Sequence, residues 1–198
     1  MKKDVIMIRH GRTDANAKKI YIGQKLDVPL SEEGREAAMA FAPELRSLVG
    51  ENIYLVSSPM KRAYETAELL FPGKEIILKD AIKEMDLGDF EGKNYEQLNG
   101  NPDYQSWIDS NGAGPIPNGE DRDDFIRRSY KAFEEIISES GDKLPVIICH
   151  GGTIMAVMSV LTGKDYFDFM IGNMEGFRLS LNIENERIMD ISYSSINA

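Results

Sequence analysis

The chain has 198 residues, of which 42% are hydrophobic and 28% charged, a composition typical of a globular protein with a substantial core. Its formal net charge of −10 argues against general nucleic-acid binding and against adhesion to anionic membranes. The single cysteine, Cys149, excludes an intrachain disulfide. Because the sequence shows no signal-like segment and no apolar run as long as a membrane span, we expect a cytoplasmic protein.

The first element is a strand that begins near residue 4 and ends at an unusual group of residues. Four consecutive apolar residues, 5–8, are typical of a strand buried on both faces. The run stops at Arg9, His10 and Gly11. Such a strand delivers the arginine and the histidine to one edge of a sheet, and glycine allows a sharp turn there.

Apolar periodicity and capping residues predict the rest of the chain in order. Residues 12–28 form a polar loop, and a helix begins at the Ser31 cap and ends near Leu48, before Gly50. The further predicted elements are a strand at 53–56, a helix at 59–70, a strand at 75–78, a helix at 119–140, a strand at 146–149, a helix at 152–161 and two closing strands at 176–182 and 187–192.

The alternation of strands and helices predicts an α/β fold with a mainly parallel central sheet and helices on both faces, plus a C-terminal antiparallel hairpin. Residues 80–118 differ, because glycine, asparagine, proline and aspartate become frequent and helices become short. We interpret the chain as a single α/β domain, 1–198, with a lid-like insertion at about 80–118.

Both histidines of the chain follow buried strands. His150 and Gly151 end the apolar run 146–149, just as His10 and Gly11 end the first strand. In open α/β sheets, ligands bind at the carboxyl ends of the strands, so the two segments predict one site. Cys149 lies within the apolar run and is interpreted as a core residue.

A phosphoryl group is the ligand that this cluster favours. Arg9 and Arg62 present planar donors for phosphate oxygens, and the helix starts after residues 57–59 and after Gly151 would add backbone N–H groups. We expect Arg62 in a first helical turn, aimed at the ligand and away from the core. The neighbouring arginines should keep His10 neutral and nucleophilic.

Five sequence blocks in order resemble the histidine phosphatase superfamily in its phosphoglycerate-mutase-like branch, including broad-specificity and α-ribazole-phosphate phosphatases. The blocks are Arg9-His10-Gly11 with Asn16, Gly23, Asp27, Pro29-Leu30-Ser31 and Gly34; residues 57–63 with Thr66-Ala67; residues 84–88 with Phe90-Glu91-Gly92; Asn118-Gly119-Glu120; and His150-Gly151-Gly152. An isolated Arg-His-Gly would be weak evidence, but the ordered set is highly specific.

The resemblance implies a role for each matching residue. His10 would be the nucleophile that becomes phosphohistidine, and Glu84 the general acid and later the base. The implied phosphate-binding residues are Arg9, Asn16, Gly23, Arg62, His150 and Gly151. The residues alone would have left Asp86 an equal candidate for the acid.

The chain departs from the family pattern at Arg12, Ala15, Phe90 and Asp121. These positions belong to the rim where specificity is decided, and Arg12 either binds a second anionic group of the substrate or is solvated.

We therefore expect a phosphomonoester hydrolase that acts on a small phosphorylated metabolite, without metal or other cofactor, as a monomer or homodimer. One alternative is a phosphoglycerate mutase, although members with that activity usually carry extra residues in the lid and C-terminal regions. A non-catalytic phospho-ligand binding protein is the other alternative, but it would not need a nucleophile and an acid together. Neither histidine has a second histidine or a cysteine at metal-ligand spacing.

Overall fold

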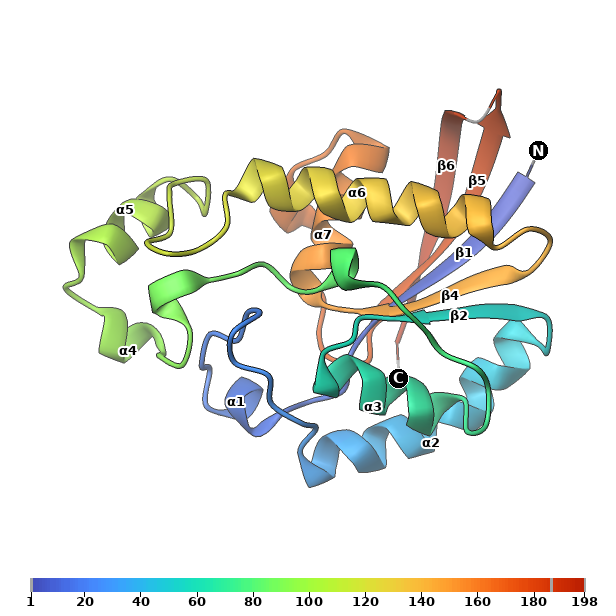
Figure 1. Cartoon of the computed structure of the whole chain (residues 1–198), viewed down its shortest axis with the longest axis horizontal. Helices are drawn as coiled ribbons and strands as arrows, with labels where there is room; N and C mark the ends of the chain where they lie inside the picture. The colour runs from blue at the N-terminus through green and yellow to red at the C-terminus, as the bar shows by residue number, and fades with distance from the viewer. Residues whose placement is uncertain (1, 186, 198) are drawn as a thin grey trace.

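The computed structural model describes residues 2–185 and 187–197 and contains a six-stranded sheet with the order β3-β2-β4-β1-β5-β6 (Figure 1). Strands β3, β2, β4 and β1 are parallel, whereas β5 is antiparallel to both β1 and β6. The strands are β1 (Lys2–Arg9), β2 (Ile53–Ser57), β3 (Ile77–Leu78), β4 (Leu144–Cys149), β5 (Gly176–Glu184) and β6 (Arg187–Ile196). The mainly parallel sheet and the closing hairpin are confirmed.

Helices cover both faces of this sheet, as predicted (Figure 1). Helices α2 (Glu32–Val49) and α3 (Lys61–Leu70) pack on one face, and α6 (Arg122–Glu139) and α7 (Gly151–Thr162) pack on the other. In β1, Val5 and Met7 point to the α6 and α7 side, while Ile6 and Ile8 point to the α2 and α3 side. Strand β4 divides its side chains in the same way, and Cys149 lies fully buried in the core. The central strands are therefore apolar on both faces.

Most of residues 80–118 form a set of short elements at one end of the molecule, whereas residues 80–82 pack against α6 (Figure 1). Residues 80–118 contain η1 (Asp80–Ile82), η2 (Gly88–Phe90), α4 (Tyr95–Leu98) and α5 (Pro102–Asp109). This segment has its own small core, in which Phe90, Tyr104 and Trp107 pack edge to face or tilted with Tyr21 from the early loop. The packing holds this segment beside the carboxyl ends of the strands.

Several element boundaries differ from the predicted ones. Helix α3 begins at Lys61 rather than at 59, and α6 begins at Arg122 because the Asp121 side chain caps it. Strand β3 contains only Ile77–Leu78, because only these residues pair with β2. The predicted loop 12–28 contains a short helix, α1 (Asp14–Ala17), and η3 (Tyr166–Phe169) follows α7. Within the described part of the chain, no helix is long and apolar enough to cross a membrane.

Candidate active site

His10 lies immediately after β1 and is 3% exposed. Its ring Nδ1 is 2.7 Å from the carbonyl oxygen of Gly11. A carbonyl oxygen only accepts hydrogen bonds, so Nδ1 carries the proton and the neutral ring keeps its lone pair on Nε2. Burial, together with the charges of Arg62 and Arg9, holds the pKa of His10 well below its ordinary value. The geometry thus leaves a neutral imidazole with one nucleophilic nitrogen.

His150 approaches His10 because β4 pairs directly with β1. In this register Arg9 lies opposite Cys149, and the two imidazole centroids are 5.2 Å apart. His150 Nε2 forms a 2.8 Å hydrogen bond with Ser58 Oγ, from the end of β2. Its Nδ1 is buried and has no partner among the groups that the structure describes. When the Ser58 hydroxyl donates to Nε2, Nδ1 carries a proton that a ligand oxygen can accept.

Two buried arginines complete the cationic part of the site. Arg9 Nη1 donates to the carbonyl of Ile171 at 2.6 Å, and Arg62 Nη2 donates to the carbonyl of Gly23 at 3.1 Å. Each Nε is buried and has no partner among the described atoms. Buried donors without partners are rare in folded proteins and indicate a missing anion or water. Both arginines therefore keep donors for a ligand.

The expectation that Arg62 points away from the core is wrong, because its side chain is 0% exposed. It lies on the buried face of α3 with Ala63, Thr66 and Leu70. From there it reaches the loop at Gly23, and it binds that loop while its Nε stays free.

The early loop places Asn16 and Gly23 beside these arginines. Asn16 Oδ1 accepts from the Thr13 backbone N–H at 3.1 Å and from Asn173 Nδ2 at 3.3 Å, which fixes the orientation of its amide. Asn173 also donates to the carbonyl of His10 at 3.0 Å. A Cβ on Gly23 would overlap the Glu91 carboxylate and a backbone carbonyl, so only glycine fits there.

Glu84 follows η1 and lies against the first turn of α7. One carboxylate oxygen accepts from the Met85 N–H at 2.9 Å, and the other accepts from the Gly152 N–H at 3.0 Å. A Cβ on Gly152 would overlap Glu84 Oε1, whereas a Cβ on Gly151 would meet only Arg9 Nε at 3.4 Å. The Tyr166 hydroxyl donates to the carbonyl of Gly152 at 3.2 Å, so Tyr166 also contacts the first turn of α7.

Two backbone N–H groups at the helix starts, which we expected to bind a phosphoryl group, instead bind carboxylates of the protein. The Gly152 N–H binds Glu84, and the Lys61 N–H at the start of α3 binds Asp27 Oδ1 at 2.8 Å. These two N–H groups are committed to carboxylates that position the site, so they are not free for a phosphoryl group.

Arg128 of α6 was missed by the sequence analysis and holds the backbone that carries Glu84. Its guanidinium binds Glu120 through two bonds of 2.6 and 2.8 Å. It also donates to the carbonyls of Ala81 at 2.8 Å, Lys83 at 3.0 Å and Glu84 at 3.0 Å. Arg128 therefore fixes the position of the 81–84 backbone relative to α6.

The structure shows the contacts of two residues whose roles the sequence analysis left open. Asp86 accepts from the Gly88 N–H at 2.8 Å and pairs with Lys25 at 3.3 Å, so it organises a turn. Arg12 is exposed and pairs with Glu33 at 2.9 Å, which matches the solvated alternative. By contrast, Glu84 lines the same cavity as Arg9 and Asn16.

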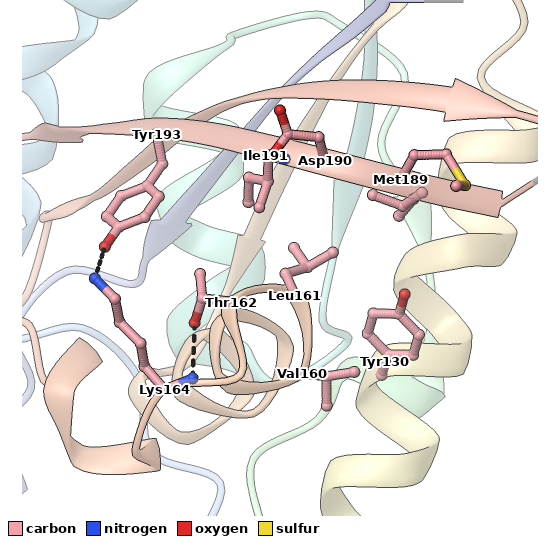
Figure 2. A pocket seen from close by; sticks show the side chains of 10 residues that line it. Tyr130, Val160, Leu161, Thr162, Lys164, Met189, Asp190, Ile191 and Tyr193 are labelled. Atoms are coloured by element: carbon pink, nitrogen blue, oxygen red, sulfur yellow. Dashed lines mark hydrogen bonds between the residues drawn. The ribbon is translucent and has the colours of Figure 1, made fainter.

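This cavity measures about 280 Å³ and lies at the carboxyl ends of the strands. A larger hollow of about 420 Å³ lies elsewhere, between α6, the end of α7 and β6 (Figure 2). There Lys164 Nζ donates to the Tyr193 hydroxyl at 3.1 Å, and Val160, Leu161 and Ile191 supply apolar wall. Arg9, Asn16, Glu84 and Gly151 line the smaller cavity, and the described residues that line the second hollow include no candidate site residue, so we place the chemistry beside the smaller cavity.

The chain is similar to several known proteins. The glucosyl-3-phosphoglycerate phosphatase of Mycolicibacterium vanbaalenii is 32% identical over 170 residues, which cover 80% of this chain and 74% of that protein. The protein named "Probable phosphoglycerate mutase GpmB" of Cronobacter sakazakii is 27% identical over 165 residues, covering 80% and 74%. The native structure of a mycobacterial glucosyl-3-phosphoglycerate phosphatase superposes with a TM-score of 0.83 at 28% identity and covers 100% of both chains.

The family model described as "Histidine phosphatase superfamily (branch 1)" matches residues 5–187, a range that contains every candidate site residue. The resemblance identified from the five sequence blocks is confirmed. The chain belongs to the histidine phosphatase superfamily, branch 1.

Proposed function

We propose that the protein hydrolyses the phosphomonoester of a small phosphorylated metabolite through a phosphohistidine at His10. The observation that carries this proposal is the hydrogen bond from His10 Nδ1 to the Gly11 carbonyl, because it leaves the Nε2 lone pair free in a buried, cationic site. A protein that only bound phosphate would not need a neutral nucleophile there. The names of the relatives support a small phosphorylated substrate.

In the first step, the His10 Nε2 lone pair forms a bond to phosphorus while the ester P–O bond breaks. The departing oxygen takes a proton from the Glu84 carboxyl group. Charge on the three equatorial oxygens is stabilised by the free donors of Arg9 and Arg62 and by His150 Nδ1. Asn16 adds a side-chain amide at the rim.

In the second step, the Glu84 carboxylate removes a proton from water, and the water oxygen bonds to phosphorus. The P–N bond breaks, its electron pair returns to His10 Nε2, and inorganic phosphate leaves. Glu84 ends protonated and ready for the next ester. We propose that no metal takes part in either step, which turnover in EDTA tests.

Trapping of the intermediate tests this function. Rapid acid-free quenching with a 32P-labelled ester should give protein-bound label that is acid-labile and base-stable. The label should be absent in His10→Ala, and turnover of alkyl phosphates should fall by about a thousandfold or more. Wild-type turnover in His10→Ala would refute the nucleophile assignment.

A mutase remains the second candidate because a relative carries that name. A mutase returns the phosphoryl group to a bound sugar acid, so it would interconvert 2- and 3-phosphoglycerate without releasing phosphate. Measuring both products from 3-phosphoglycerate separates the two functions: free phosphate supports hydrolysis, and 2-phosphoglycerate without free phosphate supports the mutase.

A further inference from the structure

The cavity at the candidate active site has two chemically different ends. Arg9, Asn16, Glu84 and the backbone of residues 151–152 form the polar end, where the phosphoryl group would bind. The remaining wall residues are hydrophobic or aromatic: Ile20, Tyr21, Ile22, Leu87, Met155, Met170 and Ile171. Since the phosphoryl group occupies the polar end, the alcohol part of an ester extends along the apolar wall.

The one hydroxyl on this wall is already paired. Tyr21 forms a 2.7 Å hydrogen bond with the Tyr104 hydroxyl inside the aromatic cluster of residues 80–118. The Tyr21 ring packs at an edge against Tyr104 and Trp107, and burial raises the pKa of its hydroxyl. The Tyr21 hydroxyl is therefore held by Tyr104, whichever of the two donates, and the Tyr21 ring forms part of the cavity wall.

This wall is also fixed in place. Ile20 forms an isolated antiparallel bridge with Asn94, and the Tyr21 N–H donates to the carbonyl of Lys93 at 2.9 Å. Ile22 is 9% exposed, and Ile171 has its carbonyl bound by Arg9 at 2.6 Å. These backbone groups of the wall are therefore already paired within the protein.

Arg9 is the only cation among the described residues that line the cavity, and the phosphoryl group requires it. Another cation near this corner of the site is Arg122, whose guanidinium lies 5.9 Å from the Tyr166 ring centroid. Arg122 Nη1 donates to the carbonyl of Asn111 at 3.1 Å, its Nε is buried without a partner among the described atoms, and the residue is not part of the cavity wall. A substrate carboxylate held on the apolar wall itself would thus lose its hydration without gaining a partner there, and Arg122 is the residue that a binding test must exclude as a partner.

We propose that the alcohol part of the substrate is apolar and uncharged, so that the preferred ester carries a small hydrocarbon group rather than a sugar acid or an amino acid. This inference rests on the proposed function. Its physical basis is that burying hydrocarbon surface against an apolar wall is favourable, whereas removing a charged group from water without giving it a partner is unfavourable. The cavity volume of about 280 Å³ fits a small hydrocarbon group.

Binding of two phosphonates with the same shape tests the proposal without turnover. 3-Methylbutylphosphonate and 2-carboxyethylphosphonate place the same number of heavy atoms on phosphorus, and only the second ends in a carboxylate. By titration calorimetry, the alkyl compound should bind about tenfold more tightly or better. Equal affinity, or tighter binding of the carboxylate, would overturn the proposal.

Two variants check the reason for that preference. Met170 lines the cavity and is 68% exposed, so Met170→Arg should bring a cation to the wall. The affinity ratio of the alkyl to the carboxylate phosphonate should then fall about fivefold or more. Arg122→Ala should leave the affinity ratio of the two phosphonates unchanged. A large loss of 2-carboxyethylphosphonate binding in Arg122→Ala would show that Arg122 recognises carboxylates and would overturn the proposal.

The corresponding esters separate this inference from the proposed function. 3-Methylbutyl phosphate and 3-phosphonooxypropionate both release a primary alkoxide, so they need similar help from Glu84. If both esters release phosphate and kcat/KM is higher for the carboxylate ester, the proposed apolar preference is wrong, while the proposed phosphatase function is supported. If neither ester is hydrolysed but the alkyl phosphonate still binds more tightly, the proposed phosphatase function is wrong, while the apolar preference of the site is supported.

Discussion

Replacing Arg128 by alanine tests whether a residue remote from the phosphoryl group controls the general acid. The guanidinium makes two bonds to Glu120 and three to the carbonyls of the 81–84 segment. Its side chain is 23% exposed and that of Glu120 is 17% exposed, so the pair is largely shielded. Breaking a buried pair costs about 3–5 kcal/mol, and partial solvent access places Arg128→Ala near the lower value, at about 3 kcal/mol.

For a chain of this length, a loss of about 3 kcal/mol lowers Tm by roughly 6–12 °C. The kinetic effect should depend on the leaving group, because the change moves the backbone of Glu84. A displacement of about 1 Å can cost about a hundredfold, so alkyl phosphates should slow by about ten- to a hundredfold. Nitrophenyl phosphate needs no protonation of its leaving group and should slow only about threefold.

The assay compares kcat/KM for an alkyl phosphate and for nitrophenyl phosphate at a temperature well below the Tm of each variant. Arg128→Lys keeps a cation but cannot form the two-bond pair, and should fall between wild type and alanine. Leu45→Ala is the control for stability alone, because Leu45 is fully buried on the opposite face of the sheet and its loss costs about 2–5 kcal/mol. An unchanged ratio of the two substrates in Arg128→Ala would refute the positioning role.

Three further predictions follow from the site. Glu84→Gln should release nitrophenol in a burst and then stall as phosphohistidine, whereas Asp86→Asn should turn over steadily; a burst in Asp86→Asn alone would exchange their roles. Gly152→Ala should slow alkyl phosphates much more than Gly151→Ala, since only the Cβ at 152 overlaps Glu84; equal rates would refute that crowding. The lowered pKa values of His10 and His150 mean that the unfolded chain binds more protons below pH 6.5, so stability falls as pH falls. From pH 7.5 to 5.5 the free energy of unfolding should therefore fall by on the order of 1 kcal/mol per histidine, and His10→Gln should lessen that fall in urea titrations.

The sequence was sufficient for the parts of the site that lie on regular strands. His10 and His150 could be placed together because apolar strands that end in His-Gly meet at one edge of a parallel sheet, and the β1–β4 register brings them to 5.2 Å. The burial of Arg62 could also have been predicted from the sequence, although we predicted a side chain aimed at the ligand and away from the core. Arg62 precedes Thr66 by four residues and so lies on the same helical stripe as Ala63, Thr66 and Leu70.

Arg128 could not have been found in this way. Three of its bonds are to backbone carbonyls of residues 81–84, more than forty positions away, and any residue type supplies such a carbonyl. Glu84 is similar, because its position depends on the path of an irregular segment and not on a helix or strand period. Resemblance to the family selected Glu84 before Asp86, and its roles in the two steps stay a prediction until the burst experiment is done.

The two buried arginines have two roles in the proposed mechanism: their positive charges lower the pKa of His10, and they bind the phosphate. Without substrate, Arg62 and Arg9 lower the pKa of His10 and keep its Nε2 lone pair available. When a phosphate dianion binds between them, its charge offsets theirs, so protonation of the imidazole becomes less unfavourable as the complex forms. The Nδ1 proton, held on the Gly11 carbonyl, then stabilises the positive charge that the ring gains on phosphorylation. The arginines thus supply a neutral nucleophile before binding and an anion site during transfer, which explains why burying two cations is tolerated in this fold.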